Sequence, residues 1–200
     1  MRKALTTVLF AAVSLVAAAQ SGTNSPYSQY GLGTLGEQSG GFNRGMNGLG
    51  IGFNEHNQVN SLNPASYATI DSLSFIFDAG ISGQITSYSE SGVKVNAKNA
   101  NFEYVIAGFR LAKRLGLSFG LLPFSNIGYS YSNTKALNST DGSTSVVKAT
   151  NTYSGTGGLH QVYLGLGWSP FKGFAIGVNA AYLWGDYSLS LIHISEPTRR

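Results

Sequence analysis

From Leu73 onward the sequence alternates between apolar residues and small or polar residues with a period of two. Alternation of this kind is typical of β-strands whose two faces meet different surroundings. The pattern therefore indicates an all-β fold built on an antiparallel sheet. Strands are predicted over residues 72–88, 102–112, 115–133 and 159–169, and from Gly173 onward.

The strand that starts near Gly173 favours a membrane-spanning sheet over a soluble β-sandwich. Residues 174–184 alternate without a break, and at about 3.3 Å per residue and a tilt near 45° they rise roughly 23 Å. The apolar band of an outer-membrane barrel is about 25 Å tall, whereas strands average about 5–6 residues in globular proteins. Phe174 and Trp184 stand at opposite ends of the apolar face, as expected for rings at two aqueous interfaces.

The opposite faces of the predicted strands carry small residues, which leaves room inside a barrel. In the strand over 115–133, Ile127, Tyr129 and Tyr131 are assigned to the outward face and the glycines to the inward face. The glycines assigned inward are Gly120, Gly128, Gly165, Gly167, Gly177 and Gly185.

The predicted connections alternate in length. Short turns are expected at 113–114 and 170–172, and long polar loops at 89–101 and 134–158. Outer-membrane barrels alternate in this way, with short periplasmic turns and long outer loops. We therefore expect an antiparallel up-and-down transmembrane β-barrel. About five strands are too few for closure, since eight is the smallest usual number, so the barrel is expected to be truncated.

Both ends of the chain are expected to lie outside the fold. Residues 1–19 combine a short basic start, an apolar run and small residues at 17–19, which predicts a signal peptide. Residues 189–199 read LSLIHISEPTR, which matches the conceptual translation of a transposase adapter used in sequencing libraries. We therefore interpret residues 189–200 as adapter sequence that interrupts a longer gene, and 72–188 as the first barrel strands.

The charge of the chain does not favour nucleic-acid binding. Of its 13 basic and 9 acidic residues, four basic residues and one acidic residue lie in the two discarded ends. The remaining 9 basic and 8 acidic residues nearly balance and form no basic cluster. The chain has no cysteine, so neither a disulfide nor a thiolate metal site is expected.

No catalytic constellation is present in the sequence. The glycine-rich run at 45–52 lacks the GK[ST] ending of a phosphate loop. His56 and His160 have no partner at metal-ligand spacing, and no serine of the mature chain sits in a G-x-S-x-G elbow. We therefore expect a protein that is not an enzyme and that has no cofactor and no metal.

Residues 20–71 are rich in glycine, serine and asparagine and cannot form a hydrophobic core alone. Their last part reads Asn63-Pro64-Ala65-Ser66-Tyr67, directly before the first predicted strand, and residues 121–131 read LLPFSNIGYSY. These motifs resemble the long-chain fatty-acid transporter (FadL) family of outer-membrane proteins. Taken alone, residues 63–65 are equally consistent with an ordinary turn before a strand.

The resemblance implies a barrel of about fourteen strands with residues 20–71 folded inside as a hatch or plug. It places Asn63, Pro64 and Ala65 at the junction between plug and first strand. The implied function is transport of hydrophobic small molecules, such as long-chain fatty acids, in the cell outer membrane. Outer-membrane lipid and a hydrophobic ligand would be the partners. The alternatives are a shuttle barrel that binds secreted protein partners, or a general porin.

Overall fold

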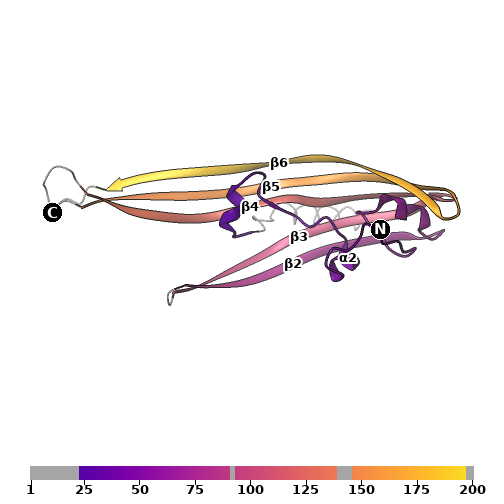
Figure 1. Cartoon of the computed structure of the whole chain (residues 1–200), viewed down its shortest axis with the longest axis horizontal. Helices are drawn as coiled ribbons and strands as arrows, with labels where there is room; N and C mark the ends of the chain where they lie inside the picture. Colours follow the sequence, from indigo (N-terminus) through magenta and orange to yellow (C-terminus); the bar gives the residue numbers. More distant parts are fainter. Residues whose placement is uncertain (1–22, 91–92, 139–145, 197–200) are drawn as a thin grey trace, which may run out of the picture.

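The computed structural model describes residues 23–90, 93–138 and 146–196. Five long strands form an antiparallel sheet in the order β2-β3-β4-β5-β6 (Figure 1). The short strand β1 pairs with β4. The elements are η1 (Pro26–Gln29), β1 (Thr34–Leu35), α2 (Gly41–Gly45), η2 (Pro64–Thr69), β2 (Phe75–Glu90), β3 (Val93–Ala112), β4 (Leu115–Asn138), β5 (Val146–Phe171) and β6 (Phe174–Glu196).

The predicted all-β, antiparallel, up-and-down arrangement of five long strands is confirmed. Within the described residues the sheet is open, because β2 pairs only with β3 and β6 only with β5. In this part of the chain, no helix has the length and apolar character needed to cross a bilayer. The predicted signal peptide at 1–19 lies outside the described residues.

The strands are longer than the sequence pattern predicts. The expected loops at 89–101 and 134–158 are wrong, because most of these residues extend β3, β4 and β5. Ladder hydrogen bonds come from the backbone and need no apolar alternation. Polar side chains also pair across the strands, as in the 3.0 Å hydrogen bond between Thr134 and Thr150. The turn at 113–114 is confirmed, and the next turn lies at 172–173.

One face of the sheet is apolar and exposed, and we call it the outer face. Ile81 is 88% exposed and Val178 64%, although both are aliphatic. The outer face follows the predicted alternation in β2, β5 and β6, and in β4 before Phe124. Its exposed apolar members are Phe75, Phe77, Ile81, Ile85, Leu111, Phe119, Val162, Leu164, Leu166, Trp168, Ile176, Val178, Tyr182 and Trp184.

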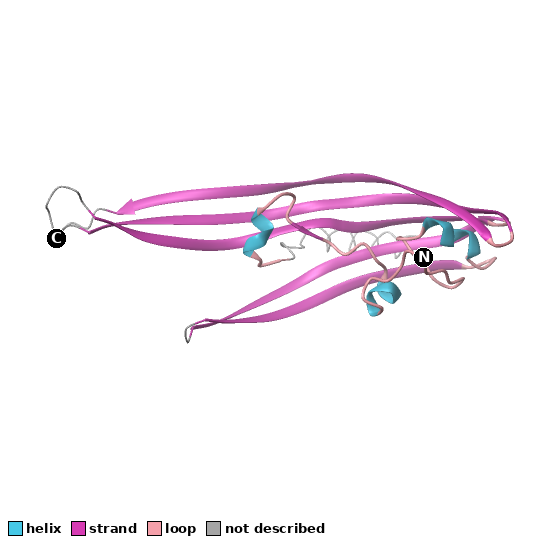
Figure 2. Ribbon diagram, in the orientation of Figure 1, coloured by secondary structure: helices cyan, strands magenta, loops and turns pink. Residues whose placement is uncertain are grey.

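Part of the opposite, inner face is covered by the N-terminal segment, defined here as residues 23–71 (Figure 2). The hydrophobic core lies between this segment and the sheet. Side chains of the segment pack there against inward side chains of the strands. The core residues are Val59, Tyr67, Ile70, Tyr104, Ile106, Leu122 and Tyr163.

A β-bulge in β4 overturns part of the predicted face assignment. Pro123 pairs with His160 and Ser125 with Leu159, which leaves Phe124 as an extra residue. An extra residue reverses the alternation that follows it. Ile127 is therefore buried on the inner face, and the Tyr131 hydroxyl donates to Gln29 of η1 at 2.8 Å. Assigning Ile127, Tyr129 and Tyr131 outward and Gly128 inward was wrong for this reason.

Strands β3 and β4 pair over only part of their length. Their ladder joins residues 105–112 of β3 to 115–121 of β4, and beyond it the β2–β3 hairpin diverges from β4 (Figure 2). There β1 takes over as the partner of β4, with Thr34 opposite Asn126 and Leu35 opposite Ser125. The N-terminal segment therefore supplies backbone pairing that β3 leaves open.

Candidate functional site at the inner face

Three glycines form a row across β4, β5 and β6. Gly116 lies directly opposite Gly167, and Gly167 lies directly opposite Gly177. Three neighbouring positions without side chains create a shallow floor where another backbone can approach the sheet. We call these three residues the glycine row.

The 3-10 helix η2 lies on the glycine row with its backbone in contact with the sheet. A Cβ added at Gly116 would lie 1.8 Å from the carbonyl oxygen of Tyr67, and one at Gly177 would lie 2.3 Å from the carbonyl carbon of Pro64. Contacts this short are impossible for real side chains, so only glycine permits η2 to lie here. Gly167 and Gly177, which were assigned to the inward face from the sequence, thus make room for the N-terminal segment, and Gly116, which was not assigned there, does the same.

The structure places Asn63, Pro64 and Ala65 at this contact. Asn63 is the N-cap residue of η2, and its carbonyl oxygen accepts hydrogen bonds from the backbone N–H (3.0 Å) and hydroxyl (2.7 Å) of Ser66. Pro64 and Ala65 lie against Gly167 and Gly177 of β5 and β6. Residues 70–74 separate η2 from β2. The role of Asn63, Pro64 and Ala65 as a junction between plug and first strand stays a prediction.

Tyr67 anchors η2 to the sheet. Its side chain is fully buried, and its hydroxyl donates to Oδ1 of Asn179 in β6 at 3.1 Å. Nδ2 of Asn179 donates in turn to the carbonyl oxygen of Ser61 at 2.8 Å. Burial raises the pKa of the Tyr67 hydroxyl, and the hydrogen bond to Asn179 opposes part of that rise.

Gln38 ties the middle of the N-terminal segment to the bulge in β4. Its Nε2 donates to the carbonyl oxygens of Pro123 and Gly36, each at 2.9 Å, and its Oε1 is hydrogen-bonded to Gln161 of β5. The backbone N–H of Gly36 donates to the carbonyl oxygen of Phe124 at 2.8 Å. The bulged residue, left without a partner in β5, thus finds one in the N-terminal segment.

A second bulge, in β3, brings the adjacent side chains of Glu103 and Tyr104 into contact with the same residue, Arg44. Gly80 pairs with Tyr104 and Ile81 with Phe102, so Glu103 is the extra residue. Bulges redirect side chains, and here Glu103 forms an ion pair with Arg44 of α2. The Arg44 guanidinium also lies over the Tyr104 ring, 5.2 Å from its centroid. Both partners of the ion pair are only about 20% exposed.

The sequence analysis did not identify Arg44, Glu103, Tyr67 or Asn179 as contact residues. One signal for Arg44 was present, since it is the only Lys or Arg between Lys3 and Lys94. A single basic residue in a long segment whose other charged residues are acidic suggests a specific acidic partner. The bulge that turns Glu103 inward leaves no such signal in the sequence.

A family model decides the relationship of this chain to known proteins: the BamG model matches residues 1–199. The chain belongs to the BamG family. No curated protein and no solved structure is found to match it. BamG is a family related to the Bam complex, and membership implies an outer-membrane-associated protein, which agrees with the broad localisation expected from the sequence.

BamG membership overturns the predicted FadL-like family and its implied function. Fatty-acid transport, and with it the shuttle and porin alternatives, is therefore withdrawn. The resemblance rested on Asn-Pro-Ala before a strand and on the LLPFSNIGYSY motif at 121–131. Both patterns are short and therefore of low specificity. In the structure, they serve the docking of η2 and the bulge of β4.

Proposed function

We propose that this BamG-family chain acts in the assembly of outer-membrane proteins, in association with the Bam complex. The observation that carries the proposal is the family match over residues 1–199. The role is proposed to be non-enzymatic, because the features of the site are backbone docking, hydrogen bonds and one ion pair. Its partners would be Bam-complex subunits or other outer-membrane proteins.

The outer face supports a location within the membrane. Its exposed aliphatic and aromatic residues form one surface over five adjacent strands, which would be unfavourable in water. In a bilayer the same apolar surface would contact the hydrocarbon chains of the lipids. A membrane-spanning strand needs about 9–11 residues, so β5 with 26 residues is long enough to cross and continue beyond the bilayer. Lipid also requires that the edges of β2 and β6 be paired.

The inner face supports a built-in plug. The N-terminal segment completes the core, covers the glycine row and pairs with β4 through β1. We propose that residues 1–19 direct export, residues 20–71 form this plug, and residues 72–188 form barrel strands. Asn63, Pro64 and Ala65 would then hold the end of the plug against β5 and β6.

A deletion strain of the source bacterium tests the assembly role. We expect lower amounts of several folded outer-membrane proteins after deletion, with their unfolded forms in the periplasm, and restoration by the wild-type gene. Crosslinking in intact cells should recover Bam-complex subunits with the tagged chain. Normal outer-membrane protein levels together with no Bam-complex crosslink would contradict the proposal.

A further inference from the structure

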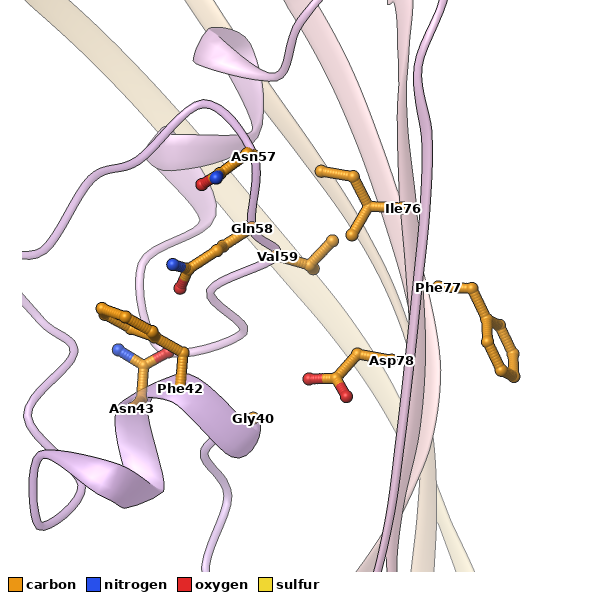
Figure 3. Close-up of a pocket in the computed structure, with 9 residues that line it drawn as sticks. All are labelled: Gly40, Phe42, Asn43, Asn57, Gln58, Val59, Ile76, Phe77 and Asp78. Carbon is orange, nitrogen blue, oxygen red and sulfur yellow. The ribbon is translucent and has the colours of Figure 1, made fainter.

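A pocket of 330 Å³ lies on the inner face, away from the glycine row. It is bounded by α2, by the chain at residues 57–59 and by β2 (Figure 3). The side chain of Asp78 points into it, whereas that of Phe77 points to the other side of the strand (Figure 3). Its lining includes Phe42, Asn43, Gln58, Val59, Ile76 and Asp78.

The Asp78 carboxylate has unused hydrogen-bonding capacity. It accepts from the Tyr104 hydroxyl at 3.1 Å and from the backbone N–H of Gly41 at 3.3 Å. A carboxylate has about four acceptor positions. Among the described residues the ion pairs are Arg44–Glu103 and His56–Asp71, so Asp78 has no cationic side chain as partner there.

A second acceptor in the lining also lacks a donor. Oε1 of Gln58 is buried, and no described residue donates a hydrogen bond to it. An unpaired buried acceptor costs about 1–3 kcal/mol. The carboxamide faces the same pocket as Asp78 (Figure 3). The polar part of the lining thus offers acceptors to a group rich in donors.

The remaining lining is apolar. Val59 is 5% exposed and belongs to the core, and Ile76 packs against that core. The ring of Phe42 is tilted against that of Phe53, with 5.1 Å between ring centroids, and Phe42 is half exposed. A ligand that reaches Asp78 would therefore pass along aliphatic and aromatic carbon.

We propose that this pocket binds a primary ammonium group on a short apolar stem. An ammonium carries three N–H donors and a positive charge, which suits the Asp78 carboxylate and the Gln58 carboxamide. The stem packs on Val59, Ile76 and Phe42. The ammonium belongs either to a free small amine or to a lysine side chain of a protein partner. The inference does not rest on the proposed assembly role.

Matched small probes test the proposal on the purified full chain in detergent micelles. n-Butylammonium should bind saturably in ligand-observed NMR, while n-butanol and butyrate should not. Asp78→Asn should weaken butylammonium binding roughly tenfold, as expected for loss of a charge-assisted contact. Asp71→Asn is the control, because Asp71 pairs with exposed His56 at 2.9 Å.

Gln58→Leu gives a second variant in case Asp78→Asn disturbs the fold. The substitution removes no hydrogen bond through Oε1, because that atom has none within the described residues. It should weaken butylammonium binding several-fold with an unchanged near-UV circular dichroism spectrum. Equal binding of n-butanol, absence of butylammonium binding, or identical affinities in wild type, Asp78→Asn and Gln58→Leu would overturn the proposal.

Two capped amino acids separate the possible sources of the ammonium. N-Acetyl-lysine amide binding as tightly as butylammonium, with N-acetyl-norleucine amide not binding, would support a lysine side chain as occupant. Butylammonium binding without N-acetyl-lysine amide binding would support a free small amine. Both outcomes keep the ammonium site and differ only in its occupant.

Discussion

The carbonyl oxygen of Pro64 lies 2.3 Å from the position that a Cβ would take at Gly167. The two residues are far apart in sequence, yet their backbones are in contact across the interface between η2 and β5. At Gly116 and Gly177, on the neighbouring strands, an added Cβ would likewise lie too close to backbone atoms of η2. The absence of three side chains thus sets how closely the N-terminal segment approaches the sheet.

Gly116→Ala should displace η2, because its methyl group would meet the backbone of Tyr67. Overpacking of this kind costs about 1–3 kcal/mol of unfolding free energy. Amide hydrogen exchange at residues 66–70 should accelerate. Gly83→Ala is the matched control, since no atom lies within 4 Å of a Cβ there. Equal exchange in the two variants would show that η2 does not depend on the glycine row.

Breaking the Arg44–Glu103 ion pair should loosen α2. The two side chains of the pair are about four-fifths buried. Breaking a fully buried pair costs about 3–5 kcal/mol of stability, whereas an exposed pair contributes about 0–1 kcal/mol, so we expect a cost between these values. We expect Arg44→Met and Glu103→Gln each to lower the free energy of unfolding by about 1–3 kcal/mol, measured by urea denaturation of the protein in detergent micelles. A double-mutant cycle measures the coupling. Fully additive losses would mean that the ion pair contributes nothing.

The docking of η2 should weaken in alkaline solution because of Tyr67. Burial raises the pKa of its hydroxyl above 10.0, so the folded state favours the neutral phenol. This stabilisation is complete below the unfolded pKa of about 10 and is lost as the pH rises through the folded pKa. Stability of wild type and Tyr67→Phe should therefore converge or cross above pH 10. Tyr30→Phe, at an exposed position, is the control.

A cation on the outer face tests the membrane location. Val178 is 64% exposed on β6. If that position lies near the bilayer centre, Val178→Arg should destabilise the folded protein by about 2–4 kcal/mol. Ser188→Arg, farther along the same strand, should have little effect on folding. Folding of the variants into lipid vesicles measures the difference. Equal folding of both variants would argue that Val178 does not face lipid.

The sequence predicted the strands best where one face is apolar. Phe75, Phe77 and Ile81 in β2, and Ile176 and Val178 in β6, alternate with small or polar residues, and the structure places them on one exposed face. Gly167 and Gly177 were also assigned inward correctly, although Gly116 was not named and the approach of the η2 backbone was not predicted. A glycine reports that something approaches closely but not what approaches.

The predictions failed where pairing depends on the backbone alone. Residues 134–138 and 146–156 lack an apolar alternation, yet β4 and β5 pair through them. Extra residues at Phe124 and Glu103 reversed or redirected side chains, and no pattern in the sequence announces a bulge. Ile127 was placed on the wrong face for this reason, and the contact between Arg44 and Glu103 was missed.

The short ladder between β3 and β4 divides the sheet into two mechanically unequal parts. Pulling the β2–β3 hairpin away from β4 breaks only the hydrogen bonds of residues 105–112, the two-residue β1 and the side-chain contacts of the N-terminal segment. Separating β4 from β5 would break a ladder that extends from Leu115 to Asn138. Under a pulling force we expect the molecule to separate first between β3 and β4. The N-terminal segment is the part of the chain that holds these two strands together.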